Sequence, residues 1–324
     1  MSLYNKYRPS EFKDLIQGNH IDQLRGDLKH HAYLFFGPAG TGKTSAARLC
    51  MSKYANPGDL ELCISGKHPD YIEINCAVNN GVDDARSMVS DIVNTMPIKS
   101  SYKVIVLDEA HMLTPSAQNA LLKTLEEPPK HIKFFLCTTE VNKVLATIRS
   151  RCQLVPFLKL KDESLYQILE NICLKEKLKF DSNSLKLISR YSSGSARQAI
   201  NLLEQCSESL GSTDAIANIL GTVDENVFFE LTSFIIKKDM KGTLNLFDSM
   251  TESSNDPYVV VNHYGDYIAE QIIKRTNTKE GPFSGNQLLV VAQAIIDILK
   301  DFKQLQNIKL ISKQHLLKAI SKIS

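Results

Sequence analysis

The chain has 324 residues, 43% hydrophobic and 23% charged, which is the composition of an ordinary globular protein with room for two or three domains. Its net charge of +2 excludes a strongly polyanion-binding chain, so any nucleic-acid contact must come from a local patch or from several copies acting together. The seven scattered cysteines form no C-x-x-C pair, which argues against a zinc module or a disulfide scaffold and favours reduced thiols in a cytosol. We find no apolar core of a secretion signal and no stretch long enough to span a bilayer.

Residues 1–31 read as an N-terminal arm that packs on the core. Pro9, which follows Tyr7 and Arg8, favours an extended chain at the start of this arm. Further along, apolar residues recur with helical spacing and predict an amphipathic helix at about residues 20–30.

The next stretch is a glycine loop, residues 37–44, between an apolar run at 32–36 and a helix-prone run at 45–54. Strand, glycine loop and helix in this order predict a P-loop, whose backbone N–H groups and helix N-terminus hold phosphates. Lys43 would reach the phosphates, and the Thr44 hydroxyl would ligate Mg²⁺. A chance glycine turn is the alternative, and the flanking elements argue against it. The predicted nucleotide-binding residues are Gly37, Pro38, Ala39, Gly40, Thr41, Gly42, Lys43, Thr44 and Ser45.

From this loop to residue 158, strand patterns alternate with helix patterns. Residues 56–69 read as a loop, residues 71–75 as a strand and residues 82–96 as a helix. The series continues with a strand at 103–107, a helix at 116–127, a strand at 133–139, a short helix at 144–148 and a strand at 153–158. Such alternation predicts an α/β fold with a parallel sheet and helices on both faces.

An acidic pair, Asp108 and Glu109, ends the apolar strand at 103–107. Open α/β sheets bind their ligands at the carboxyl ends of the strands. Asp108 is therefore a candidate for holding Mg²⁺, and Glu109 for polarising an attacking water. The alternative is that two carboxylates simply end a strand.

The strand signal disappears at about residue 159. Helices are predicted at 165–177, at 184–191 and from 196 to 208, the last capped by Ser193 or Ser195. Only helical patterns follow, ending in a basic helix. We therefore expect an ATPase domain at 1–158, a small helical domain at 159–222 and a third, all-helical domain at 223–324.

Five further motifs accompany the glycine loop. They are Tyr7-Arg8-Pro9, Asp108-Glu109-Ala110-His111, the Leu-Leu-Lys-Thr-Leu-Glu-Glu-Pro-Pro run at 121–129, Ser150-Arg151-Cys152 and Gly194-Ser195-Ala196-Arg197. In this order they resemble the motor subunits of DNA polymerase sliding-clamp loaders, which include the bacterial gamma/tau subunit and the small subunits of replication factor C. The resemblance is dense over residues 4–208, whereas the last hundred residues match only in being helical. It implies an AAA+ P-loop NTPase with a helical lid domain and an all-α C-terminal collar domain.

The resemblance also implies roles for single residues in nucleotide binding. Lys43 and Thr44 would bind the triphosphate and Mg²⁺, and Asp108 and Glu109 would form the Walker B pair. A wall around the adenine and ribose would be formed by Tyr7, Arg8, Pro9 and Ile16.

Three more positions would act on the bound nucleotide. Thr139 would be sensor 1, touching the γ-phosphate or its water, and Arg197 would be sensor 2, reaching back from the lid onto the nucleotide of its own subunit. Arg151 would be an arginine finger acting on ATP held by the neighbouring subunit, so an isolated subunit would be a poor ATPase. The alternatives are that Thr139 merely ends a strand and that both arginines are surface charges.

DNA contact in this family comes from the inner face of a spiral of subunits, where a few contacts are repeated. Arg86 and Lys99 are the candidates here, with solvated helix charges as the alternative. Asn75 is a candidate switch that holds Glu109 until DNA arrives. Gln118 is a candidate coupling residue between the ATP and DNA sites, or an ordinary exposed helix residue.

The sequence departs from the bacterial gamma pattern in one segment. That family carries a four-cysteine zinc insertion after the P-loop helix, whereas this chain has only Cys50 and Cys63 there. We therefore expect no zinc, and a viral or otherwise divergent source stays open.

The sequence thus predicts an ATP- and Mg²⁺-dependent motor subunit that opens a sliding clamp and loads it onto primer-template DNA. Its expected partners are other loader subunits in a pentameric assembly, the clamp and DNA, with no membrane. It would act in the cytoplasm of a prokaryote or of an infected host cell, or in the nucleus of a eukaryote. The alternatives are a branch-migration helicase or replication initiator, a non-hydrolysing scaffold subunit of a loader, and a P-loop regulator that binds ATP without DNA.

Overall fold

The computed structural model describes residues 2–16, 19–78, 93–207, 216, 225–253, 257–278, 281–301 and 308–323. Contacts divide the chain into two units, Met1–Glu208 and Ser209–Ser324, which we describe separately. The expected boundary at 158/159 falls within the first unit, and the one at 222/223 lies outside the described residues. None of the described helices combines the length and apolar character needed to cross a membrane.

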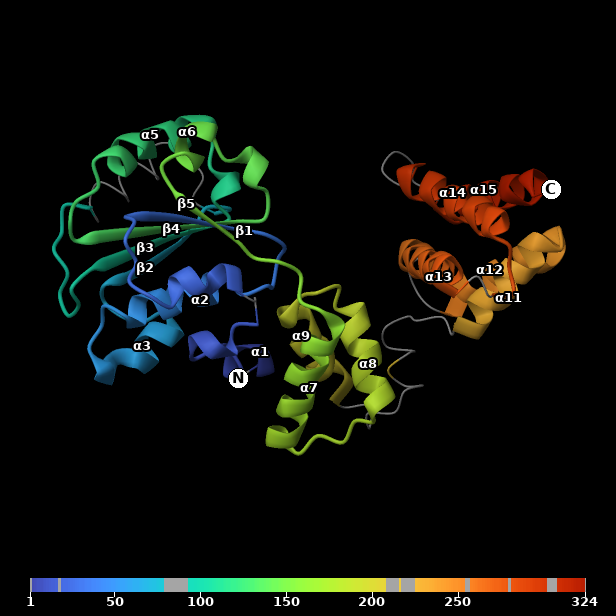
Figure 1. Cartoon of the computed structure of the whole chain (residues 1–324), viewed down its shortest axis with the longest axis horizontal. Coiled ribbons are helices and arrows are strands. Elements are labelled where there is room, and N and C mark those ends of the chain that lie inside the picture. Colours follow the sequence, from blue (N-terminus) through green and yellow to red (C-terminus); the bar gives the residue numbers. More distant parts are fainter. Residues whose placement is uncertain are drawn as a thin grey trace. The chain divides into compact units, whose positions relative to one another are not determined.

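The first unit is built around a five-stranded parallel sheet, which confirms the predicted fold class (Figure 1). The strands are β1 (Ala32–Phe36), β2 (Tyr71–Asn75), β3 (Lys103–Asp108), β4 (Ile132–Thr138) and β5 (Gln153–Pro156), in the order β2-β3-β4-β1-β5. Because the strands are parallel, the segments that follow β1, β3 and β4 meet at one edge of the sheet. This edge is where a ligand of an open α/β sheet binds.

Helices cover both faces of the sheet (Figure 1), and its inner strands β1, β3 and β4 are buried on both sides. Helices α2 (Lys43–Ser52) and α3 (Leu60–Ser65) lie on one face, and α5 (Pro115–Glu126) and α6 (Ala146–Arg149) on the other. Val104 and Val106 of β3 belong to the core on the first face, whereas Ile105 and Leu107 belong to the core on the second. This alternation explains why a continuous apolar run forms an inner strand.

Two predicted elements were wrong. The expected loop at 56–69 contains a 3₁₀ turn, Pro57–Asp59, and helix α3, because Cys63 and Ile64 pack into the core beside α2. The expected helix at 20–30 is replaced by a 3₁₀ helix, Asn19–Leu24. Ile21 and Leu24 are both fully buried at a spacing of three residues, which suits the three-residue period of a 3₁₀ helix.

A small helical bundle completes the first unit. It consists of α7 (Asp162–Glu176), α8 (Ser182–Tyr191) and α9 (Ala196–Cys206), and the N-terminal helix α1 (Leu3–Lys6) packs against α9. Of the two predicted caps for α9, the Ser195 hydroxyl is the one that accepts a hydrogen bond from the Gln198 N–H. The short α1 helix thus ties the N-terminal arm to this bundle.

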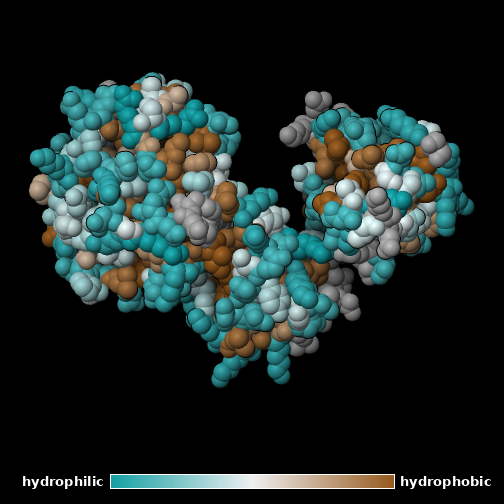
Figure 2. Space-filling model, viewed as in Figure 1, coloured by the Kyte–Doolittle hydropathy of each residue, from teal (hydrophilic) through white to brown (hydrophobic). Residues whose placement is uncertain are grey.

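In the second unit, all the described elements are helices. They are α11 (Glu225–Ile236), α12 (Met240–Ser253), α13 (Pro257–Thr278), α14 (Gly285–Asp301) and α15 (Ile308–Lys322). The basic helix α15 joins α12 through Asp248, which accepts ion pairs from Lys309 at 2.9 Å and Lys313 at 2.7 Å. Hydrophilic side chains predominate on the face that Figure 2 shows, and apolar ones form smaller patches.

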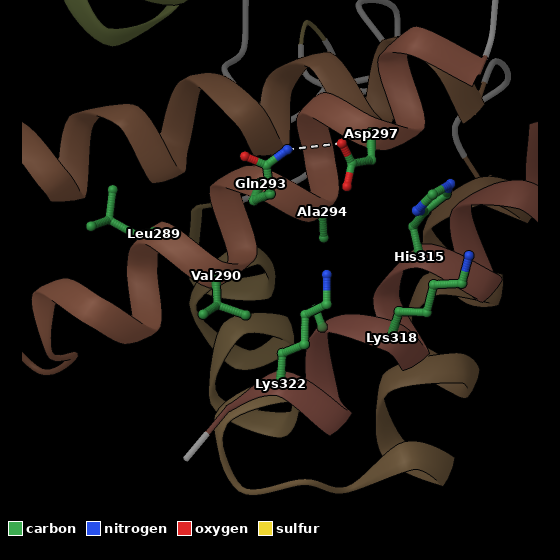
Figure 3. Close-up of a pocket in the computed structure, with 9 residues that line it drawn as sticks. Leu289, Val290, Gln293, Ala294, Asp297, His315, Lys318 and Lys322 are labelled. Carbon is green, nitrogen blue, oxygen red and sulfur yellow. Dashed lines mark hydrogen bonds between the residues drawn. The ribbon is translucent and has the colours of Figure 1, made fainter.

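A hollow of about 350 Å³ lies between α14 and α15 (Figure 3). Leu289 and Ala294 of α14 contribute apolar surface, and Lys318 and Lys322 of α15 contribute charge. The residues that line this hollow include neither a glycine loop nor a pair of carboxylates. The candidate nucleotide site therefore lies in the first unit.

Candidate nucleotide-binding site

The glycine loop connects β1 to α2 and has a tightly constrained backbone. Gly37, Gly40 and Gly42 have φ values of 145°, 72° and 100°, a region that side chains strongly disfavour. A Cβ atom on Gly37 would lie 1.9 Å from the carbonyl oxygen of Phe157, which follows β5. Glycine at this position therefore lets the loop lie against the edge of the sheet.

Lys43 closes this loop through its side chain. Its Nζ donates hydrogen bonds to the carbonyl oxygens of Gly37 at 2.7 Å and Pro38 at 2.8 Å. Burial lowers the pKa of Lys43, while the neighbouring Cys137, Glu109 and Asp108 oppose that change. The ammonium group is thus held inside the loop by acceptors that phosphate oxygens can replace.

A hydroxyl and a carboxylate meet beside the loop. The Thr44 hydroxyl donates to Asp108 Oδ2 at 3.2 Å, which joins the start of α2 to the end of β3. Burial, and then the charge of Glu109, raise the pKa of Asp108. A cation at this position would relieve both effects, and these oxygens are the ligand type that Mg²⁺ prefers. The residues present therefore fit Mg²⁺.

Glu109 lies next to Asp108 and contacts the end of β4. Its backbone has a φ of 52°, an uncommon conformation for a residue other than glycine. The Thr139 hydroxyl donates to Glu109 Oε2 at 3.3 Å. The structure therefore brings together the predicted residues that follow β1, β3 and β4.

The start of helix α9 lies against the glycine loop. A Cβ atom on Gly40 would be 2.0 Å from Ser195 Oγ and 3.0 Å from Arg197 Cβ. The guanidinium of Arg197 stacks 5.0 Å from the ring centroid of Tyr4, and that of Arg8 lies 5.5 Å from the same ring. The N-terminal arm thus holds the predicted sensor 2 arginine beside the loop.

The residues predicted to surround the adenine lie in different places: Tyr7 contacts the end of α7, and Ile16 is partly exposed. The Tyr7 hydroxyl donates to Glu176 Oε1 at the end of α7, and this bond raises the pKa of Tyr7 to about 12. Ile16 is 36% exposed, whereas its neighbour Leu15 is buried, with Cδ2 only 3.1 Å from where a Cβ on Gly42 would lie. Leu15 therefore contacts the loop directly.

Arg151 is exposed and follows the short helix α6. Its guanidinium donates to Glu126 Oε1 at 2.5 Å and to the Thr147 carbonyl at 2.8 Å. Glu126 belongs to the Leu-Leu-Lys-Thr-Leu-Glu-Glu-Pro-Pro run, so this motif supports the arginine of the Ser-Arg-Cys motif.

The coupling candidates lie near the site. Gln118 is 3% exposed, so the alternative of an exposed helix residue is wrong. Its Nε2 donates to the Leu113 and Lys143 carbonyls, and its Oε1 accepts from the Leu145 N–H at 2.8 Å. Asn75 pairs in register with Asp108 across β2 and β3.

Of the two DNA candidates, Arg86 lies outside the described residues, and Lys99 is exposed. Asp70 fixes the backbone at Lys99, because its carboxylate accepts hydrogen bonds from the N–H groups of Ile98, Lys99 and Ser100 at 2.6 to 2.9 Å. Burial alone would raise the pKa of Asp70, but these bonds outweigh it and hold the pKa below its ordinary value.

We expect Asp70→Asn to lower the free energy of unfolding by about 2–4 kcal/mol at pH 7, because an amide nitrogen would face N–H donors. The native pKa lies below the unfolded value of about 3.9, so the carboxylate stabilises the fold above that pH. The contribution is lost as the pH falls through the native pKa. Urea denaturation at pH 7 and at lower pH should show the difference between variant and parent shrinking. Asp22→Asn, which breaks an exposed pair with Arg25, is the control and should change little.

Sequence reasoning missed three residues at the site: Tyr4, Leu15 and His111. The contacts of Tyr4 and Leu15 join segments far apart in the chain, and no local pattern marks these two residues. His111 lies inside the Asp-Glu-Ala-His motif, but the motif alone assigns it no role. In the described residues, no group of three or more His, Cys, Asp or Glu side chains is arranged to hold a metal ion. The expected absence of zinc stays a prediction.

The strand order, the glycine loop after β1 and the acidic pair after β3 define a P-loop ATPase of the AAA+ class. Solved structures with this fold include the Thermotoga maritima RuvB Holliday junction branch migration motor, with a TM-score of 0.52 and 18% identity, covering 82% of this chain and 91% of that one. A single-residue variant of the same RuvB gives a TM-score of 0.52 at 19% identity, over 82% and 91% of the two chains. At such low identity these similarities show the fold alone.

Sequence comparisons identify the family. The model described as "DNA polymerase III, delta subunit" matches residues 17–161. DNA polymerase III subunit gamma of Buchnera aphidicola (strain APS) is 37% identical over 270 residues, which cover 77% of this chain and 74% of that protein. Subunit tau of Bacillus subtilis is 35% identical over 296 residues, covering 85% of this chain and 52% of that protein, so the chain spans about half of this longer relative. The chain belongs to the gamma/tau family of DNA polymerase III clamp-loader subunits, as its motifs predicted.

Proposed function

We propose that this chain is an ATP-driven motor subunit of a DNA polymerase clamp loader. ATP binding would assemble subunits into a spiral that opens a sliding clamp, and primer-template DNA would trigger hydrolysis and release of the closed clamp. The observation that carries the proposal is the meeting of Lys43, the Thr44–Asp108 pair and the Glu109–Thr139 pair at one sheet edge. Membership of the gamma/tau family supplies the biological context.

Each residue at this edge has a task that suits its contacts. The loop N–H groups and Lys43 bind the phosphates, and Lys43 exchanges two carbonyl acceptors for phosphate oxygens. Thr44 and Asp108 would hold Mg²⁺, which when bound offsets the phosphate charge. Glu109 accepts a proton from the attacking water, and Thr139 orients that water or the γ-phosphate.

The remaining roles involve other parts of the chain and other subunits. Arg197 belongs to a helical lid, residues 159–222, and contacts the nucleotide of its own subunit. Arg151 acts on ATP bound by a neighbouring subunit. Residues 223–324 form a collar that joins the subunits into a pentameric assembly, and Lys99, with Arg86, contacts DNA. As a replication protein the chain would act in the cytoplasm.

The alternatives account for fewer of the observations. A branch-migration motor has the same fold, but curated relatives at 34–37% identity are polymerase III subunits, and the described part of residues 225–323 contains helices without strands. A non-hydrolysing scaffold subunit has no need for Lys43, Asp108 and Glu109 together. A regulator that binds ATP alone leaves the Ser-Arg-Cys motif unexplained.

ATP turnover by the chain with its partner subunits tests this proposal. We expect primed DNA together with the cognate clamp to stimulate turnover strongly, whereas unprimed duplex or either component alone should stimulate it less. Turnover that ignores both DNA and clamp would refute the loader proposal. ATP-dependent strand unwinding in the same preparation would favour the helicase alternative instead.

A further inference from the structure

His111 lies between two carboxylates at the carboxyl edge of the sheet, and its side chain is 7% exposed. Its Nδ1 is 3.3 Å from Glu109 Oε2 and 3.1 Å from Thr138 Oγ1, and its Nε2 is 3.5 Å from Glu140 Oε1. Glu140 also pairs with Lys143 at 2.9 Å. The imidazole thus connects the residue after β3 with the segment that follows β4.

These contacts constrain Glu109 on one side. Glu109 Oε2 lies within 3.3 Å of two side chains, the Thr139 hydroxyl and His111 Nδ1. Glu109 itself is 37% exposed, so protein packing alone does not fix its carboxylate. A short 3₁₀ turn, Ala110–Met112, places His111 two residues after Glu109, where its ring faces back toward that carboxylate.

We propose that His111 is a positioning residue for Glu109, holding the carboxylate in the orientation that accepts the proton of the attacking water. Its second nitrogen, facing Glu140, ties that orientation to the segment next to Thr139. The inference rests on the proposed function, because it requires Glu109 to act in ATP hydrolysis. His111, the histidine of the Asp-Glu-Ala-His motif, would thus serve in catalysis and not only in the packing of the fold.

The size of the effect follows from geometry. Misplacing a catalytic group by about 1 Å can cost about 100-fold in rate. Among the side chains that the structure describes, removing the imidazole leaves the Thr139 hydroxyl to hold the Glu109 carboxylate. We therefore expect His111→Ala to lower kcat for ATP about 10- to 100-fold. KM and the dissociation constant for a non-hydrolysable ATP analogue should stay unchanged, since His111 does not contact the glycine loop.

Two amide variants distinguish the contributions of the two ring nitrogens to turnover. The Asn side-chain nitrogen approximates the position of Nδ1, so His111→Asn should restore most of the turnover. The Gln nitrogen approximates Nε2, so His111→Gln should remain close to His111→Ala. Glu140→Gln breaks only the outer contact and should lower kcat less than His111→Ala does. His31→Asn is a matched control at the opposite edge of the sheet, where Nδ1 lies 3.5 Å from the Ile132 carbonyl, and should leave kcat unchanged.

All variants should be measured in the full assembly with primed DNA and clamp, with thermal unfolding recorded for each. Unchanged kcat in His111→Ala, or equal rescue by Asn and Gln, would overturn the proposal. So would a rise in DNA-independent turnover, because His111 would then restrain Glu109. If His111→Ala does not fold, the Asn and Gln pair decides the question. Absence of turnover in the parent assembly would instead defeat the proposed function, and analogue binding would show whether the nucleotide site itself exists.

Discussion

Replacing Arg151 by alanine should lower ATP turnover of the assembled protein by about 10³- to 10⁵-fold, the range that arginine fingers supply. The guanidinium would stabilise charge that develops on the phosphates of a neighbouring subunit. It is exposed in the single chain and held by Glu126 and the Thr147 carbonyl, outside its own glycine loop. Turnover with and without primed DNA and clamp measures the effect, while analogue binding should be nearly unchanged.

Two further variants test whether the loss of turnover is specific to the Arg151 guanidinium. Arg25→Ala removes another exposed arginine with a carboxylate partner and should leave turnover unchanged. Glu126→Gln keeps the guanidinium but weakens its support, so we expect a much smaller loss than for Arg151→Ala. Full turnover in the Arg151→Ala assembly would show that each chain hydrolyses ATP without help from a neighbour.

The second large effect is expected at Lys43. Lys43→Ala should weaken nucleotide binding by at least about 100-fold, because charge-assisted hydrogen bonds contribute about 1.5–3 kcal/mol each. The variant also removes the two hydrogen bonds that join Lys43 to the Gly37 and Pro38 carbonyls of the loop. Titration with an ATP analogue, followed by calorimetry, measures the loss directly and does not depend on turnover.

Lys133 provides a matched control for Lys43. It is also buried, and its Nζ donates to two carbonyls, those of Leu28 and His30, each at 2.9 Å. Because Lys133 lies at the amino end of β4, Lys133→Ala should lower stability without changing nucleotide affinity. Equal losses of affinity in both variants would mean that Lys43 acts only by stabilising the fold.

Combining the two variants tests action between subunits. An Arg151→Ala chain can still bind ATP, and a Lys43→Ala chain can still present its arginine. Mixed assemblies should therefore recover part of the turnover that each variant lacks alone. No recovery in mixtures that assemble normally would count against a finger acting on a neighbour.

Local sequence patterns predicted the parts of the site that depend on neighbouring residues. An apolar run before glycines and another before an acidic pair were enough to place β1, the loop and β3. Thr139 ends a third apolar strand, but its proposed role at the site came from the family resemblance and not from this pattern. These patterns succeed because an inner parallel strand must be apolar on both faces.

The contacts between distant segments could not be predicted in this way. Gln118 lies on the buried face of α5 with Leu121 and Leu125, but its amide also bonds to the Lys143 and Leu145 backbone on another segment, which its own helix does not indicate. His111 meets Glu140 only because β3 and β4 are neighbours in the sheet. Tyr4 contacts Arg197, although the two residues lie near opposite ends of the sequence of the first unit.

The stacking of Arg197 on Tyr4 has a practical consequence, since the chain contains no tryptophan. An indole introduced by Tyr4→Trp would be the only one in the chain and would lie beneath Arg197, the proposed sensor 2 residue. Its fluorescence would depend on whether that cation stays in place. The N-terminal arm thereby offers an intrinsic optical probe of movement in the proposed lid, which could be followed without a chemical label.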